Sequence, residues 1–218
     1  MESTSSRAYR SGLRATQAAQ TRERVLRAAA ELFSAQGYQA TTFAAIAREA
    51  GVSTETVKAA GAKSALLIAA FEVTFSGTEG ADSLTDTEAG AGVIDLPNEV
   101  FLAAVIARIV DANARAHALW TVLLGAAGSD ELVAGALQTI LTRRREDYRM
   151  LVAELIRRAL VPARAAERAD ELADELSFLM SPEGYQQLVG QSGWSRERYA
   201  GWIDGRVLEW ASAANVAG

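Results

Sequence analysis

The segment from Thr41 to Lys63, TTFAAIAREAGVSTETVKAAGAK, constrains the fold more than any other part of the chain. Gly51 stands at its centre, and a glycine just past a helix takes the left-handed conformation without a Cβ penalty. Ala47 is small enough to let two helices cross closely at a steep angle. Thr42 can cap the first helix and Ser53 the second. The apolar positions between the helices are Ile46, Ala50, Val52 and Val57. The spacing predicts a helix-turn-helix over about 42–61; the alternative is an ordinary helical hairpin inside a bundle.

The remaining sequence predicts an all-α fold. Half of the residues are apolar, only three are proline, and no run shows the period-two alternation of a strand. Helical spacing over 98–110 and again over 114–127 predicts two segments. A long helix should follow, capped by Ser129. The predicted organisation is a flexible basic arm (1–20), a helix-turn-helix domain with a connecting helix (21–76), a loop or linker (77–97) and a helical ligand-binding and dimerisation domain (98–218).

Residue usage narrows the chemistry that this chain can perform. There is no cysteine and His117 is the single histidine. Thiolate chemistry is therefore absent, and a hydrolytic triad or a histidine-based zinc site lacks parts. The N-terminal residues are polar, and the longest apolar run, 116–128, is too short to span a bilayer. We expect a cytoplasmic protein that is not an enzyme and uses no metal, cofactor or membrane.

Charge is distributed unevenly along the chain. Residues 1–75 carry nine Lys or Arg and six Asp or Glu, a net +3, whereas residues 76–218 carry thirteen and twenty-one, a net −8. A basic N-terminal part on an acidic body is typical of a domain that meets a polyanion. A solvated charged surface is the alternative interpretation.

The 98–218 part contains candidate residues for a small-molecule pocket. They combine aromatic walls with a few polar groups, as ligand pockets do: Phe101, Asn113, His117, Trp120 and Tyr148. Packing of an ordinary core would give the same pattern. A run of charges at 143–147, RRRED, could bind an anion, although salt pairing within the long helix is the interpretation we favour.

Two helices near the C-terminus carry more apolar surface than one chain is expected to bury. We interpret them as a dimerisation pair that forms a four-helix bundle with a second copy. The alternative is that they complete the core of their own chain. The predicted dimerisation residues are Leu172, Leu176, Leu179, Tyr199, Trp202, Ile203, Arg206 and Trp210.

Two stretches of the chain resemble the TetR-type (tetracycline-repressor-like) transcriptional regulators. They are TRERVLRAAAELFSAQGYQATTFAAIAREAGVS (21–53) and LSFLMSPEGYQQLVGQSGWSRERYAGWI (176–203). The resemblance implies a homodimeric, ligand-responsive regulator, a repressor, that binds double-stranded operator DNA. It also implies an unidentified small-molecule effector, whose entry shifts the DNA-binding heads.

The chain departs from the family pattern after Val57. Family members usually have a Tyr and a Phe in the following positions; here Lys58 follows directly, one residue is missing before Lys63, and both aromatics are absent. The resemblance places base contacts at Thr54, Glu55 and Thr56, and phosphate contacts at Thr42, Lys58 and Lys63. The alternative is a degenerate member that has weakened or lost DNA binding and acts as a ligand-binding or protein-interaction dimer.

Overall fold

The computed structural model describes residues 3–212, and their side chains over 14–210. Within this part of the chain there are helices and no strands, so the all-α prediction is confirmed. The helices are α1 (Ser3–Ala40), α2 (Phe43–Ala50), α3 (Thr54–Ala60), α4 (Lys63–Ser76), α5 (Asn98–Ala127), α6 (Glu131–Arg157), α7 (Ala169–Leu179), α8 (Pro182–Tyr185) and α9 (Arg196–Ser212). Shorter turns of helix are η1 (Leu84–Asp86), η2 (Ala163–Arg168) and η3 (Gln186–Gln191). No single described helix is both long and apolar enough to cross a membrane, though α3 and α4 taken together, bent by 73°, meet that length and composition.

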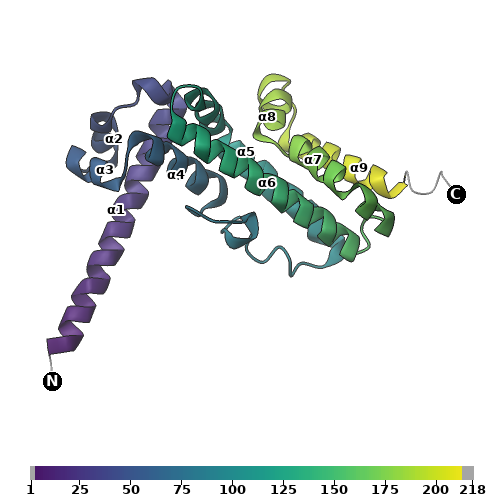
Figure 1. Cartoon of the computed structure of the whole chain (residues 1–218), viewed down its shortest axis with the longest axis horizontal. Helices are drawn as coiled ribbons and strands as arrows, with labels where there is room; N and C mark the ends of the chain where they lie inside the picture. Colours follow the sequence, from purple (N-terminus) through teal and green to yellow (C-terminus); the bar gives the residue numbers. More distant parts are fainter. Residues whose placement is uncertain (1–2, 213–218) are drawn as a thin grey trace.

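The central motif folds as its local sequence dictates. Helix α2 begins after Thr42, whose side-chain oxygen accepts a hydrogen bond from the Ala45 N–H at 3.1 Å. It ends at Gly51, which adopts the left-handed conformation with φ 64° and ψ 41°. Ser53 then caps α3 by accepting from the Thr56 N–H at 3.1 Å. All three expected end signals are present, and together they make a helix-turn-helix (Figure 1).

Two apolar cores hold the helices together. The first joins the N-terminal helices to the end of α5 and the start of α6, where Trp120, Leu123 and Val133 are buried against them. The second fills the other end of the molecule, between the start of α5, the end of α6 and α7–α9. Helices α5 and α6 lie side by side and take part in both cores (Figure 1). The helix-turn-helix is therefore packed directly on the body.

Two details of the predicted helices were wrong. The segments predicted over 98–110 and 114–127 are one helix, α5, because nothing between them breaks the backbone pattern. Asp130, not Ser129, caps α6: its carboxylate accepts from the N–H groups of Leu132 and Val133 at 3.1 and 3.2 Å. Ser129 instead donates to a backbone carbonyl of α5.

The N-terminal segment also differs from the flexible arm expected over residues 1–20. Helix α1 begins at Ser3 and continues through the predicted boundary at Thr21. Residues 3–20 contain no proline and one glycine, so the backbone has little to stop a helix from extending. Residues 14–20 are exposed, and in Figure 1 this part of α1 projects away from the other helices.

The turn glycine can be tested against a glycine inside a helix. At both Gly51 and Gly135 an added Cβ would meet no atom within 4 Å, but Gly51 has φ 64° whereas Gly135 lies within α6. Gly51→Ala should lower the free energy of unfolding by about 1–2 kcal/mol, the cost of a left-handed Ala. Gly135→Ala should raise it by about 0.5–1 kcal/mol. Urea denaturation measures both; the same sign for the two variants would contradict the assignment of the turn.

Candidate functional site

The exposed face of the second helix of the motif carries most of the predicted DNA-contacting residues. Glu55 and Lys58 are exposed on α3, and Thr42 is exposed at the start of α2. Thr54 and Thr56 are half-buried, and the Thr56 hydroxyl shares a hydrogen bond of 3.0 Å with the Ser53 hydroxyl. The start of α3 thus presents one acid and one base to solvent.

Lys63 is held by the protein's own groups. Its ammonium donates to the Gln39 carbonyl at 3.2 Å and lies 4.7 Å from the centre of the Tyr38 ring. Burial lowers the pKa of this lysine. Lys63 therefore secures the start of α4 against the end of α1, and this contact competes with the phosphate contact predicted from the sequence.

Arg22 of α1 connects the end of α3 to the following loop. Its Nη1 donates to the carbonyl of Ala60, the last residue of α3, at 2.8 Å. Its Nε donates to the Glu79 carboxylate, also at 2.8 Å. The hydrogen bond to Arg22 lowers the pKa of Glu79. The Arg22 guanidinium thus caps the end of α3 and pairs with the first part of the 77–97 loop.

A second contact joins the motif to the body. The Tyr38 hydroxyl donates to Asp130 at 2.7 Å, and Asp130 in turn caps α6. Burial and this hydrogen bond raise the pKa of Tyr38 to about 12. The Tyr38 ring also stacks on Phe33 in the first core, with ring centres 5.9 Å apart. The start of α6 is therefore fixed to the helix-turn-helix domain.

A cavity of about 230 Å³ lies in the body, between α4, α5, α6 and the 77–97 loop. Its walls are mostly apolar, with polar and charged groups at intervals. The apolar and aromatic lining includes Phe71, Phe75, Phe101, Val105, Ile109, Trp120, Tyr148 and Leu151. A mostly apolar hollow with a few polar groups is the usual form of a small-molecule site.

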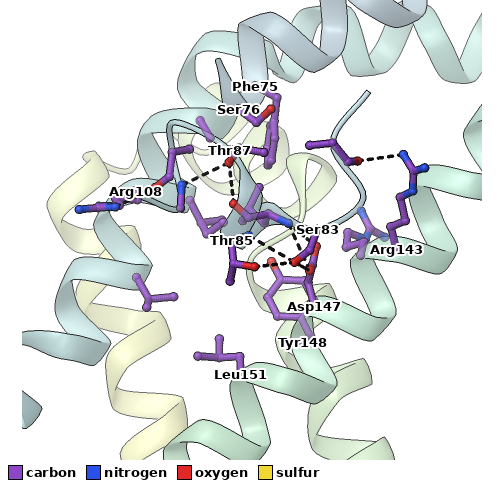
Figure 2. A pocket seen from close by; sticks show the side chains of 18 of the residues that line it. Phe75, Ser76, Ser83, Thr85, Thr87, Arg108, Arg143, Asp147, Tyr148 and Leu151 are labelled. Atoms are coloured by element: carbon purple, nitrogen blue, oxygen red, sulfur yellow. Dashed lines mark hydrogen bonds between the residues drawn. The ribbon is translucent and has the colours of Figure 1, made fainter. Parts of the chain in front are cut away.

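The 77–97 loop closes one side of this cavity through a carboxylate of α6. Asp147 accepts from the Ser83 hydroxyl at 2.6 Å and from the Leu84 N–H at 3.2 Å, as Figure 2 shows. Burial raises the pKa of Asp147, against the opposing effect of these hydrogen bonds. The Gly- and acid-rich segment predicted as a loop is thus a wall of the cavity.

Arginines from α5 and α6 hold the loop along its length. Arg108 donates to the Ala89 and Ala91 carbonyls at 2.9 and 2.7 Å. Arg143 donates to the Ala81 carbonyl and to Asp82 (Figure 2), and Arg158 donates to the carbonyls of Ile94 and Leu96. These contacts could not be predicted from the sequence, because their acceptors are backbone carbonyls, which every residue type has.

The predicted pocket residues separate into two groups. Phe101, Trp120 and Tyr148 line the cavity. Asn113 and His117 are outside its lining: the Asn113 amide donates to the Met180 carbonyl at 2.9 Å, and the His117 ring packs against Tyr185 at 5.4 Å. Both therefore take part in packing between α5 and the C-terminal helices.

The sequence predicted that the three adjacent arginines of α6 pair within their own helix. In the structure they do not. Arg143 pairs with the loop, and Arg145 pairs with Asp174 of α7 at 2.9 Å. Between them, Arg144 lies over the Trp120 ring at 5.5 Å, and its Nε and Nη1 atoms are buried without a hydrogen-bond partner. Successive helical positions point about 100° apart, so neighbours in sequence meet different elements.

Most of the predicted dimerisation residues lie in the core of their own chain. Leu172, Leu176, Leu179, Tyr199 and Ile203 are buried in the second core. Their side chains are therefore already covered, and they have little surface left for a partner. Trp202 and Trp210 are half-buried and Arg206 is exposed.

The remaining surface of α7 and α9 includes large apolar side chains. Phe178 on α7 is 68% exposed and Leu208 on α9 is 51% exposed. The two helices are neighbours, since the Trp210 indole N–H donates to Glu175 of α7 at 3.0 Å. An interface on this side would use these outward residues.

Comparison with known proteins agrees with this arrangement. Residues 25–70, from α1 into α4, match the model of the bacterial regulatory proteins of the tetR family. These residues form a DNA-binding domain of the tetR type. The helix-turn-helix is part of this domain, which is that of a transcriptional regulator.

A solved structure has the same fold over most of the chain. It is the crystal structure of a candidate transcriptional regulator from Pseudomonas aeruginosa PAO1, with a TM-score of 0.62 and 18% sequence identity. The alignment covers 90% of each chain. No curated protein matches this sequence.

At acidic pH the C-terminal end of the 77–97 loop should be held less firmly, because Glu154 pairs with Arg158, which donates to the carbonyls there. Hydrogen bonds from Arg157 and Arg158 lower the pKa of Glu154 from 4.5 to about 2. Its stabilising effect is therefore complete above pH 4.5 and is lost as the pH falls toward 2. The thermal midpoint of wild type should drop more between pH 6 and pH 3 than that of Glu154→Gln, by about 2–4 °C. Circular dichroism measures this, with the exposed Glu167→Gln as control; equal drops in wild type and Glu154→Gln would contradict it.

Proposed function

We propose that this TetR-type regulator is a homodimeric, ligand-responsive repressor that binds a pseudo-palindromic operator. The observation that carries the proposal is the capped helix-turn-helix with the exposed start of α3. In such motifs the second helix enters the major groove, and residues at its start meet base edges. Two copies related by a twofold axis would place one α3 in each of two successive grooves.

The exposed residues define separate roles on the DNA. Glu55 can accept a hydrogen bond from a cytosine amino group, and Thr54 can contact a neighbouring base edge. Lys58 can neutralise a phosphate, and Thr42 with the free N–H groups at the start of α2 can bind another. Lys63 contributes mainly by fixing α4, since its ammonium already binds the Gln39 carbonyl.

The same structure supports a route for the ligand response. Glu79 lies between Thr78 and Ala81, two loop residues that line the cavity. It pairs with Arg22, which holds the last carbonyl of α3. A ligand that displaces the loop would therefore change the support of the recognition helix. Such a switch acts by shifting the population of two head positions, only one of which matches the operator.

One observation favours a second candidate function, a dimer with weakened DNA binding. Helix α3 has seven residues, and the lysine that follows it is engaged within the protein. The family's usual Tyr and Phe are absent from this region. This candidate predicts that no DNA sequence is bound more tightly than random DNA.

DNA binding is tested by a gel shift with the DNA upstream of the gene, titrated with salt. Lys58→Ala should weaken binding to all sequences alike and reduce the slope of log K against log salt by about 0.9. Glu55→Ala should instead change the preference at one base pair, by about 1–3 kcal/mol. Removal of a body charge by Arg164→Ala is the control and should change neither quantity.

The outcomes separate the two candidates. A specific shift that salt abolishes, with different effects of the two variants, supports the operator-binding regulator. Identical effects of Lys58→Ala and Glu55→Ala would contradict the assigned roles. Binding no tighter than to random DNA, across a library of genomic fragments, would favour the dimer that no longer recognises an operator.

The dimer interface can be tested with a pair of equally exposed residues. Phe178 on α7 and Leu132 at the start of α6 are both 68% exposed. If α7 and α9 form the interface, Phe178→Asp buries a charge there and should shift the protein to monomer, raising the dimer dissociation constant at least tenfold. Sedimentation velocity measures this. Leu132→Asp should leave the dimer intact, and a dimer equally stable in both variants would place the interface elsewhere.

A further inference from the structure

The cavity contains hydrogen-bond donors that the protein leaves unsatisfied. The Nε and Nη1 atoms of Arg144 are buried and donate to no partner, and the same is true of the indole Nε1 of Trp120. Both residues line the cavity, and Trp120 is 2% exposed. The nearest counter-charge to Arg144 is Glu183, at 3.8 Å, which is too long for a hydrogen bond. Buried donors are normally paired, so three unpaired ones in one cavity need an explanation.

The other charged groups of the cavity do not share this property. Each has a hydrogen-bond partner within the protein: Glu72, Asp82, Arg108, Arg143, Asp147 and Glu154. Most of these partners belong to the loop and serve to hold it. Among the described lining residues, Arg144 is therefore the charged group with buried donors that no protein group accepts from.

The cavity is elongated, and Arg144 lies toward one end of it. Its lining runs from Phe101 to Trp120 along α5, about 28 Å at 1.5 Å per residue, and from Ile140 to Glu154 along α6, about 21 Å. Because the two helices are antiparallel, Trp120 and Arg144 meet near one end, with the guanidinium carbon 5.5 Å from the ring centre. Toward the other end Val105, Met150 and Leu151 make the walls largely apolar. The charged Arg108 and Glu154 also lie there, and both are paired within the protein.

We propose that the ligand is an elongated apolar monocarboxylate, with its carboxylate on Arg144 and its chain along α5 and α6. The inference rests on the proposed function as a ligand-responsive regulator. Nη2 shares one edge of a guanidinium with Nε and another with Nη1, and either edge presents two parallel N–H donors that match the two oxygens of a carboxylate. The Trp120 N–H is a further donor without a partner in the same part of the lining. A single negative charge suits a cation whose nearest carboxylate, that of Glu183, is 3.8 Å away and accepts no hydrogen bond from it. A doubly charged phosphate would face the carboxylates of Asp147, one turn away on α6, and Glu183.

This position puts the ligand's charged end beside the DNA-binding domain. Trp120 packs against Phe71 of α4, with ring centres 5.4 Å apart. Helix α4 follows the recognition helix directly and carries the first core. The ligand's carboxylate would thus bind at the end of the cavity that adjoins the DNA-binding domain. Its apolar chain would extend away from that domain.

The test uses decanoate as the probe and 1-decanol as its uncharged match, titrated into the full-length protein by calorimetry. Wild type should bind decanoate at least tenfold more tightly than 1-decanol. Arg144→Met, which keeps the length of the side chain but removes its donors, should abolish that difference and leave 1-decanol binding unchanged. Arg145→Met removes the same charge from the neighbouring position, outside the cavity lining, and should behave as wild type. Thermal unfolding confirms that each variant is folded.

The results distinguish failure of this inference from failure of the proposed function. Equal affinities of wild type for the two probes, or unchanged decanoate binding by Arg144→Met, would overturn the carboxylate assignment even if either probe releases DNA in the gel shift. No binding of either probe by a protein that still binds its operator would also overturn it. Arg144-dependent binding of decanoate with no effect on the gel shift would uphold the inference and contradict the ligand response.

Discussion

The contact of Trp120 with Phe71 is the point on which the rest of this structure depends. Trp120 comes from α5 and Phe71 from α4, and both are buried in the core that the helix-turn-helix shares with the body. Both also line the cavity. Burying a large aromatic pair contributes several kcal/mol, and truncating either ring typically costs about 3–5 kcal/mol. The same pair therefore stabilises the fold and gives the cavity a wall that the DNA-binding domain shares.

The loop of residues 77–97 adds polar contacts to the apolar contact of Trp120 with Phe71. Its carbonyls are met by arginines of α5 and α6, and its Ser83 and Leu84 bind a carboxylate that burial makes costly to ionise. A wall held by hydrogen bonds is more easily opened than one held by packing, since water can replace each bond at small net cost. The cavity thus has one side made of packed helices and one side, the loop, that is held largely by hydrogen bonds, with Val93 of the loop buried in the second core.

Sequence analysis predicted what depends on local pattern and missed what depends on distant partners. The caps at Thr42 and Ser53 and the turn at Gly51 were correct, because each is specified within a few residues. The continuity of α5 was missed because its apolar spacing weakens in the middle. The position of Arg144 beside the cavity could not be predicted for a different reason, which is that three adjacent arginines look alike in sequence. Only the packing of α6 places one at the loop, one at the cavity and one at α7.

The shortened recognition region shows how one missing residue is accommodated. Deleting a helical residue rotates everything after it by about 100°, which would turn the apolar face of α4 away from its core. Here α3 ends at Ala60, and the chain bends by 73° into α4 through Gly61, whose φ of 149° favours glycine. Arg22 satisfies the carbonyl left at the end of α3 and pairs with Glu79 at the start of the loop. Through these two contacts, the guanidinium of Arg22 holds both the recognition helix, α3, and the loop wall of the cavity. If ligand and DNA favour different positions of that loop, each must weaken the binding of the other by the same factor, because coupling between two binding sites is reciprocal.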